Sequence, residues 1–86
     1  MRHTALLTLI CLLAAATPAL ASDEASALYE RALTEDDLRA IRTLVQARKL
    51  DQKDYRIPYR IGFLYHKMNR RPEAREAYEA TLALKP

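Results

Sequence analysis

Apolar residues recur every three or four positions along most of the chain, and no long stretch alternates apolar and polar residues. This spacing is typical of amphipathic α-helices rather than β-strands. An all-α fold is therefore expected. The pattern predicts four helices: one over roughly Asp23–Leu33, one that begins near Thr34, one that begins between Asp54 and Pro58, and one that opens at Pro72 and Glu73.

Each predicted helix carries one apolar stripe. We expect these stripes to face a shared core, because apolar side chains leave water when the chain folds. The members of the four stripes, in chain order, are Ala25, Leu28, Tyr29, Ala32 and Leu33; Leu38, Ile41, Leu44 and Val45; Ile57, Ile61, Leu64, Tyr65 and Met68; and Ala74, Ala77, Tyr78, Thr81 and Leu82.

Polar residues mark the ends of the predicted helices. The hydroxyl of Thr34, with Asp37 three residues later, is similar to a capping box and predicts the start of the second helix. Arg48 and Lys49 suit the negative end of that helix. Asn69 is the predicted left-handed residue that ends the third helix.

The amino-terminal segment, residues 1–21, has the pattern of a secretory signal peptide. Its second residue is an arginine, Ala5–Ala16 is apolar and uncharged, and Ala19–Ala21 offers small residues at a cleavage site. We therefore predict export, with cleavage after Ala21. The alternative is an uncleaved membrane anchor, because the uncharged run Thr4–Ala21 approaches the length of about 20 residues that spans a bilayer.

Removal of this segment would also remove Cys11, the only cysteine of the chain. The exported chain would then have no disulfide, thiol nucleophile or cysteine metal site. His66 would be its only histidine, with no second histidine or cysteine to share a metal. The sequence also lacks a phosphate-binding loop and a catalytic triad. We therefore expect that the protein is not an enzyme and has no cofactor.

Charge is unevenly distributed along the chain. The net charge is +3 at pH 7, and Arg48–Arg71 holds eight basic residues against Asp51 and Asp54, whereas Ser22–Asp37 is mainly acidic. This asymmetry favours an acidic protein or peptide partner, or head-to-tail association of like chains. A nucleic-acid partner is not expected for an exported chain, and a membrane would be contacted only through an uncleaved signal segment.

One spaced pattern covers Tyr55–Pro86. It consists of Pro58-x2-Ile61-Gly62-x2-Tyr65, then Ala74-x3-Tyr78, then Pro86. The pattern resembles the tetratricopeptide repeat (TPR), a helix–turn–helix unit with the signature W-x2-L-G-x2-Y, A-x3-F and P. The resemblance implies a protein-binding module in which Gly62 lets two helices approach closely and Tyr65 and Tyr78 fill the space between them. The chain departs from the signature at Pro58, Asn69 and Thr81, where the family has a large aromatic residue, glycine and alanine.

A weaker copy of the unit precedes it at the family's period of 34 residues. Ala74, Tyr78, Thr81 and Leu84 fall on Ala40, Leu44, Ala47 and Leu50, whereas Gly62 and Tyr65 fall on Leu28 and Arg31. The expected organisation is a signal peptide (1–21), a degenerate TPR-like hairpin (22–54) and a TPR repeat (55–86). The two hairpins would be antiparallel helix–turn–helix units of an α-solenoid. The alternative is an unrelated helical hairpin packed against one true repeat.

The third predicted helix has a second stripe, which we take as the candidate partner-binding site. Its residues are Arg56, Arg60, Phe63 and Lys67, with Tyr59 and His66 beside them. The resemblance implies that this side lines a concave groove. Guanidinium groups beside aromatic rings suit acidic or aromatic peptide segments. The alternative is a solvated basic face whose long side chains only cover apolar surface.

These features predict an exported protein–protein interaction module, an adaptor or scaffold that is periplasmic or secreted in a bacterial envelope. Two repeats without a polar capping helix are few for an independent solenoid. One alternative is therefore a structural module that forms homo-oligomers through its last helix, around Tyr78 and Leu82. Another is that the chain is the leading piece of a longer repeat protein.

Overall fold

The chain forms four helices over residues 18–85, the range that the structure, a computed structural model, describes. α2 spans Pro18–Ala32, α3 spans Asp37–Leu50, α4 spans Arg56–Lys67 and α5 spans Arg71–Leu84. No strand occurs over this range, so the all-α prediction is confirmed for it. Most of the predicted signal peptide, with Cys11, lies outside the described residues, as does Pro86.

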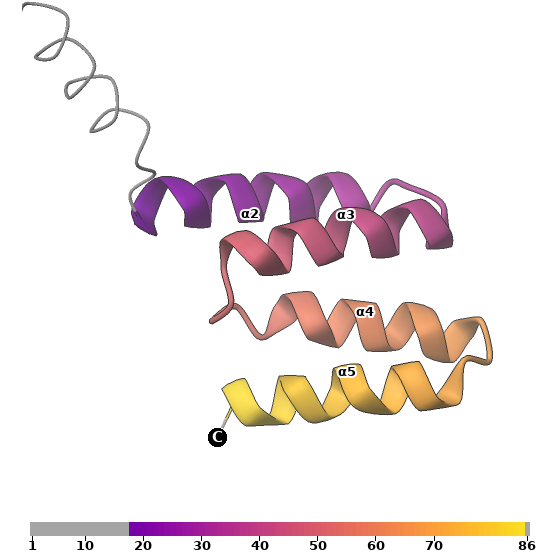
Figure 1. Cartoon of the computed structure of the whole chain (residues 1–86). Helices are drawn as coiled ribbons and strands as arrows, with labels where there is room; N and C mark the ends of the chain where they lie inside the picture. Colours follow the sequence, from indigo (N-terminus) through magenta and orange to yellow (C-terminus); the bar gives the residue numbers. More distant parts are fainter. Residues whose placement is uncertain (1–17, 86) are drawn as a thin grey trace, which may run out of the picture.

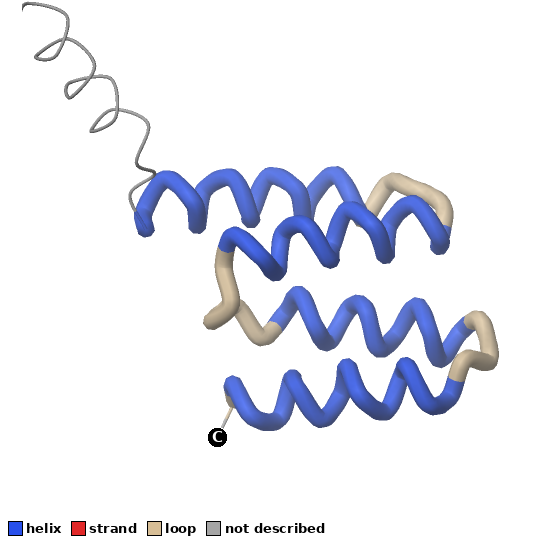
Figure 2. Tube along the Cα trace, viewed as in Figure 1, coloured by secondary structure: helices blue, strands red, loops and turns tan. Residues whose placement is uncertain are grey.

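Consecutive helices run in opposite directions and lie beside one another in chain order (Figure 1). α2 contacts α3, α3 contacts α4, and α4 contacts α5. Short loops connect them (Figure 2), and short loops favour antiparallel packing of sequence neighbours. The amino-terminal end of α2 therefore lies at the same end of the array as the carboxyl-terminal ends of α3 and α5 (Figure 1).

One hydrophobic core runs between the helices, and all four contribute to it. Its buried apolar residues are Ala25, Ala32, Ala40, Ile41, Leu44, Ala47, Ile57, Ile61, Leu64, Ala74 and Ala77. Leu28, Tyr29, Tyr65 and Met68 are partly buried against this core. Many of the buried residues are alanines, and small side chains at a helix contact allow a short distance between helix axes.

Some residues of the predicted apolar stripes lie at the surface instead, so their expected burial is wrong, although an exposed Leu82 is also what the self-association alternative expects. They are Leu33, Leu38, Val45 and Leu82. Leu33 follows the last residue of α2. The buried side of α3 is centred on Leu44, so Leu38 and Val45 lie on its flank. Leu82 is 72% exposed because α5 has one extensive helix neighbour, α4, in residues 18–85.

Gly62 lies where α4 and α5 meet. A Cβ atom added to Gly62 would be 2.8 Å from both Cδ1 and Cε1 of the Tyr78 ring. Real Cβ atoms do not come this close to ring carbons, since the attraction between carbon atoms is best at about 3.5–4.0 Å. The structure thus confirms that Gly62 allows the close approach of α5.

The ends of the helices differ in part from the sequence prediction. Asp36, not Thr34, caps α3: its Oδ1 accepts a hydrogen bond from the backbone N–H of Arg39 at 3.0 Å. The hydroxyl of Thr34 donates instead to the carbonyl oxygen of Arg31, at 2.8 Å, beyond the end of α2. Asn69 has φ 60°, which confirms its predicted left-handed conformation. α2 begins at Pro18 rather than at Asp23, so the predicted cleavage point after Ala21 lies in its first turn.

We expect Asp36→Ala to lower the free energy of unfolding by about 1 kcal/mol, because it leaves a backbone N–H at the start of α3 without its acceptor. Denaturant unfolding followed by circular dichroism measures the change. Thr34→Ala is the matched control, with a smaller expected loss, since its hydroxyl does not cap α3. A larger loss for Thr34→Ala than for Asp36→Ala would contradict the assignment of the cap.

Candidate partner-binding site

The six candidate residues all lie on α4, and the structure divides them into two groups. An adjacent side of α4 is buried through Ile57, Ile61 and Leu64. With 3.6 residues per turn, the stripe that begins at Arg56 lies roughly 110° around the helix from this buried side. We call Arg56, Arg60, Phe63 and Lys67 the basic–aromatic face. Tyr59 and His66 lie nearer to α5.

Arg56 is held by residues of its own chain. Its Nη2 donates to Oδ2 of Asp54 at 2.7 Å, and its Nε donates to Oδ1 at 3.0 Å. These hydrogen bonds lower the pKa of Asp54, although partial burial of the carboxyl acts in the opposite direction. The guanidinium of Arg56 also lies 4.8 Å from the centre of the Tyr29 ring on α2. Arg56 is therefore already provided with a carboxylate and an aromatic partner.

Lys67 is also paired within the chain. Its Nζ lies 3.4 Å from Oδ1 of Asp37, in the first turn of α3. Both side chains are partly exposed, and exposed ion pairs contribute little to stability. The pair nevertheless occupies the ammonium group, so Lys67 is less available to a partner than the sequence suggested.

Arg60 differs from these two cations. Its guanidinium lies 4.9 Å from the centre of the Phe63 ring, one turn further along α4. The side chain is half-buried, and its Nε is buried without a hydrogen-bond partner in residues 18–85. Within the same range it forms no ion pair with a carboxylate, unlike Arg56 and Lys67. Arg60 therefore carries the charge of the basic–aromatic face that has no carboxylate partner in this range. It lies beside Phe63, which is 40% exposed.

Tyr59 and His66 are directed toward α5. The Tyr59 ring is 55% exposed, and its centre lies 5.9 Å from that of Tyr78. Burial raises the pKa of Tyr78, with a further contribution from Tyr59. His66 lines a surface hollow of about 280 Å³ with residues of α5 that include Tyr78 and Leu82. A ligand on the basic–aromatic face would therefore meet these two residues only at its edge.

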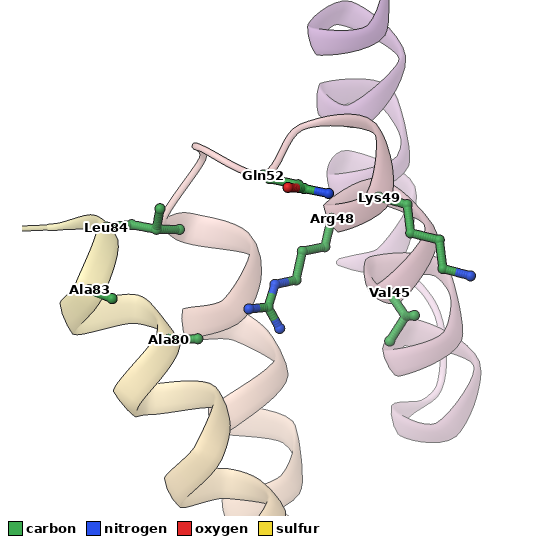
Figure 3. Close-up of a pocket in the computed structure, with 7 residues that line it drawn as sticks. All are labelled: Val45, Arg48, Lys49, Gln52, Ala80, Ala83 and Leu84. Carbon is green, nitrogen blue, oxygen red and sulfur yellow. The ribbon is translucent and has the colours of Figure 1, made fainter.

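The sequence prediction missed a groove between α3 and α5. One hollow of about 500 Å³ is lined by Val45, Arg48, Lys49, Gln52, Ala80, Ala83 and Leu84. A second, of about 220 Å³, shares Val45 and Arg48 and continues past Ala77 to Glu73 and Glu76. Arg48 extends from α3 toward Ala80 on α5, while Lys49 points to the other side of α3 (Figure 3). A signal was present in Ala77, Ala80 and Ala83, small residues three positions apart that lead from the buried side of α5 toward its exposed side.

Comparisons with protein-family models, with curated proteins and with solved structures found no match to this chain. Within residues 18–85, no group of three or more histidine, aspartate or glutamate side chains is arranged to hold a metal ion. None of α2, α3, α4 and α5 has both the length and the apolar character that crossing a membrane requires.

Proposed function

We propose that the chain is an exported protein-interaction module of the TPR kind, periplasmic or secreted in a bacterial envelope. Its partner would be a protein that presents an acidic segment to the basic–aromatic face of α4. Two features support the proposal. Antiparallel helices follow one another in chain order, and Gly62 admits the Tyr78 ring at the contact of α4 with α5. The proposed activity is binding alone, without catalysis or a cofactor.

The half-buried Arg60 is the observation that carries this proposal. A guanidinium with no carboxylate partner in the described residues can donate paired hydrogen bonds to an incoming carboxylate. Phe63 below it holds the planar group by stacking and offers apolar surface to the neighbouring residue of the partner. Arg56 and Lys67, already paired, would add long-range attraction for an acidic segment more than direct contacts.

We expect Arg60→Glu to abolish capture of the acidic partner from an envelope extract, because it reverses the one unused charge of the face. The measurement compares proteins captured by the wild type and by the variant, with circular dichroism to verify the fold. Arg42→Glu is the matched control, since Arg42 is exposed on α3, outside this face. Identical partner lists for wild type and Arg60→Glu would contradict the proposal. Arg56→Glu is less informative because it also breaks the bonds to Asp54.

A second candidate function is structural self-association through the outer side of α5. The observation in its favour is Leu82, 72% exposed beside the hollow that Tyr78 lines. Large apolar side chains that stay exposed together are typical of interaction surfaces. Light scattering of Leu82→Glu against the wild type tests it.

A further inference from the structure

The α3–α5 groove has an apolar floor and opposite charges along its length. Val45, Ala80 and Ala83 form part of its lining. Arg48 lines both hollows of the groove and extends toward Ala80 (Figure 3), and Glu76 lines the second hollow. No ion pair or hydrogen bond involves either charged side chain within residues 18–85, whereas Glu73 is occupied by Arg70 at 3.2 Å. Lys49 also lines the first hollow without an ion pair in this range, but its side chain points to the other side of α3 (Figure 3). Arg48 is therefore the free cation directed into the groove, and Glu76 is its free anion.

The outer flank of α2 carries the opposite arrangement. Glu24, Ala27, Leu28 and Arg31 line a hollow of about 350 Å³ there. Glu24 has no ion-pair partner in the described range, and Arg31 makes one long contact, 3.8 Å, with Glu35. Ala27 and Leu28 supply apolar surface between the two charges. We call these four residues the α2 flank.

The order of charges on the two surfaces is complementary. Glu24 and Arg31 are seven positions apart on α2, which corresponds to about 10.5 Å along a helix at 1.5 Å per residue. On α5, Glu76 lies four positions before Ala80, toward which Arg48 extends (Figure 3), so the anion precedes the cation along α5. An α2 laid antiparallel to α5 would place Glu24 near Arg48 and Arg31 near Glu76. Ala27 and Leu28 would then rest on Ala80 and Val45.

We infer that the α3–α5 groove binds the α2 flank of a second copy of this chain. The charges make the pairing directional, because the reverse orientation would place Arg31 on Arg48 and Glu24 on Glu76. The small side chains of Ala80 and Ala83 allow the incoming helix to approach closely. The α3–α5 groove and the α2 flank would be the two surfaces of the head-to-tail association that the uneven charge of the sequence predicts. It uses none of the residues of the basic–aromatic face, so it does not rest on the proposed function.

Charge exchange between the two surfaces tests the inference. The full chain is expressed with its own amino-terminal segment, purified in the form that results, and examined by sedimentation over a range of concentrations. We expect self-association that Arg48→Glu or Glu24→Arg alone weakens by about tenfold, since an attraction becomes a repulsion. Combining Arg48→Glu with Glu24→Arg should restore it. Arg42→Glu and Arg60→Glu, outside both surfaces, should leave it unchanged.

Disulfide trapping tests the geometry of the contact between the α2 flank and the α3–α5 groove. In a Cys11→Ala background, a chain with Ala27→Cys and a chain with Ala80→Cys should form a disulfide when mixed and oxidised. Neither chain alone should do so to the same extent. A monomer at all concentrations, or association that ignores both charge reversals, would overturn the inference. Association that only Leu82→Glu abolishes would place the contact on the outer side of α5, and this result would also overturn the inference.

Discussion

Leu44→Ala is expected to lower the free energy of unfolding by about 2–5 kcal/mol, the range for removing a large buried side chain. Leu44 is 0% exposed and belongs to α3, which packs against both α2 and α4. The cavity would therefore weaken two helix contacts at once. A domain of this size has a total stability of only about 3–10 kcal/mol. Much of the variant should be unfolded under conditions in which the wild type is folded, as circular dichroism can measure.

Leu82→Ala is the matched control for this experiment. It deletes the same atoms from a leucine that is 72% exposed on α5. We expect a change of no more than about 0.5 kcal/mol when the protein is dilute enough to be monomeric. Equal losses for Leu44→Ala and Leu82→Ala would mean that α5 is covered in solution, or that the core is not centred on α3.

Gly62→Ala should destabilise the chain, although alanine is by itself the better helix former. The substitution gains about 1 kcal/mol of helix propensity. It also places a methyl group 2.8 Å from two carbons of the Tyr78 ring, so α4 and α5 must separate or the ring must move. Such overpacking costs about 1–3 kcal/mol. We expect a net loss in denaturant unfolding, with a larger one for Gly62→Leu.

The Tyr78→Ala background distinguishes the clash from other effects. Without the ring, the same Gly62→Ala substitution should stabilise the chain by about 1 kcal/mol, since only the propensity term remains. This reversal of sign is the coupling that a double-mutant cycle measures between residues in contact. Stabilisation by Gly62→Ala in both backgrounds would show that Tyr78 does not pack on Gly62 in solution.

The binding surface proposed for α4 is more selective than its composition suggests. Three cations follow one another on that face, but Arg56 and Lys67 already have carboxylate partners in Asp54 and Asp37. A carboxylate from another protein would have to displace these partners to bind there. Recognition would therefore depend mainly on Arg60 and Phe63, so single substitutions at this pair should have larger effects than elsewhere on the face.

Local signals explain which parts of the fold were predicted correctly. The four helices follow from apolar residues spaced three and four apart, and Asn69 adopts the left-handed conformation that its position after α4 suggested. The cap of α3 was misplaced by two residues. Between Thr34 and Asp37 every side chain can accept a hydrogen bond, and only the turn geometry selects Asp36.

Exposure was predicted less well than helix position. Val45 and Leu82 satisfy the apolar spacing of their helices yet remain at the surface. Spacing tells which residues share a side of a helix, but the side that becomes buried depends on where the neighbouring helices lie. Ala40 and Ala47 lie on the buried side of α3, whereas the larger Val45 lies on its flank.

By itself, the sequence determined the helical class, the positions of the turns and the basic, aromatic character of α4, because each depends on residues within a few positions of one another. Only the tertiary structure decided which charges remain available. Lys67 is paired by Asp37, 30 positions away, and Arg56 stacks on Tyr29 of another helix. The α3–α5 groove likewise exists only because the chain reverses twice between Arg48 and Ala80. Contacts between distant residues leave no periodic trace in the sequence, so the free Arg60 and the groove could be found only in the folded chain.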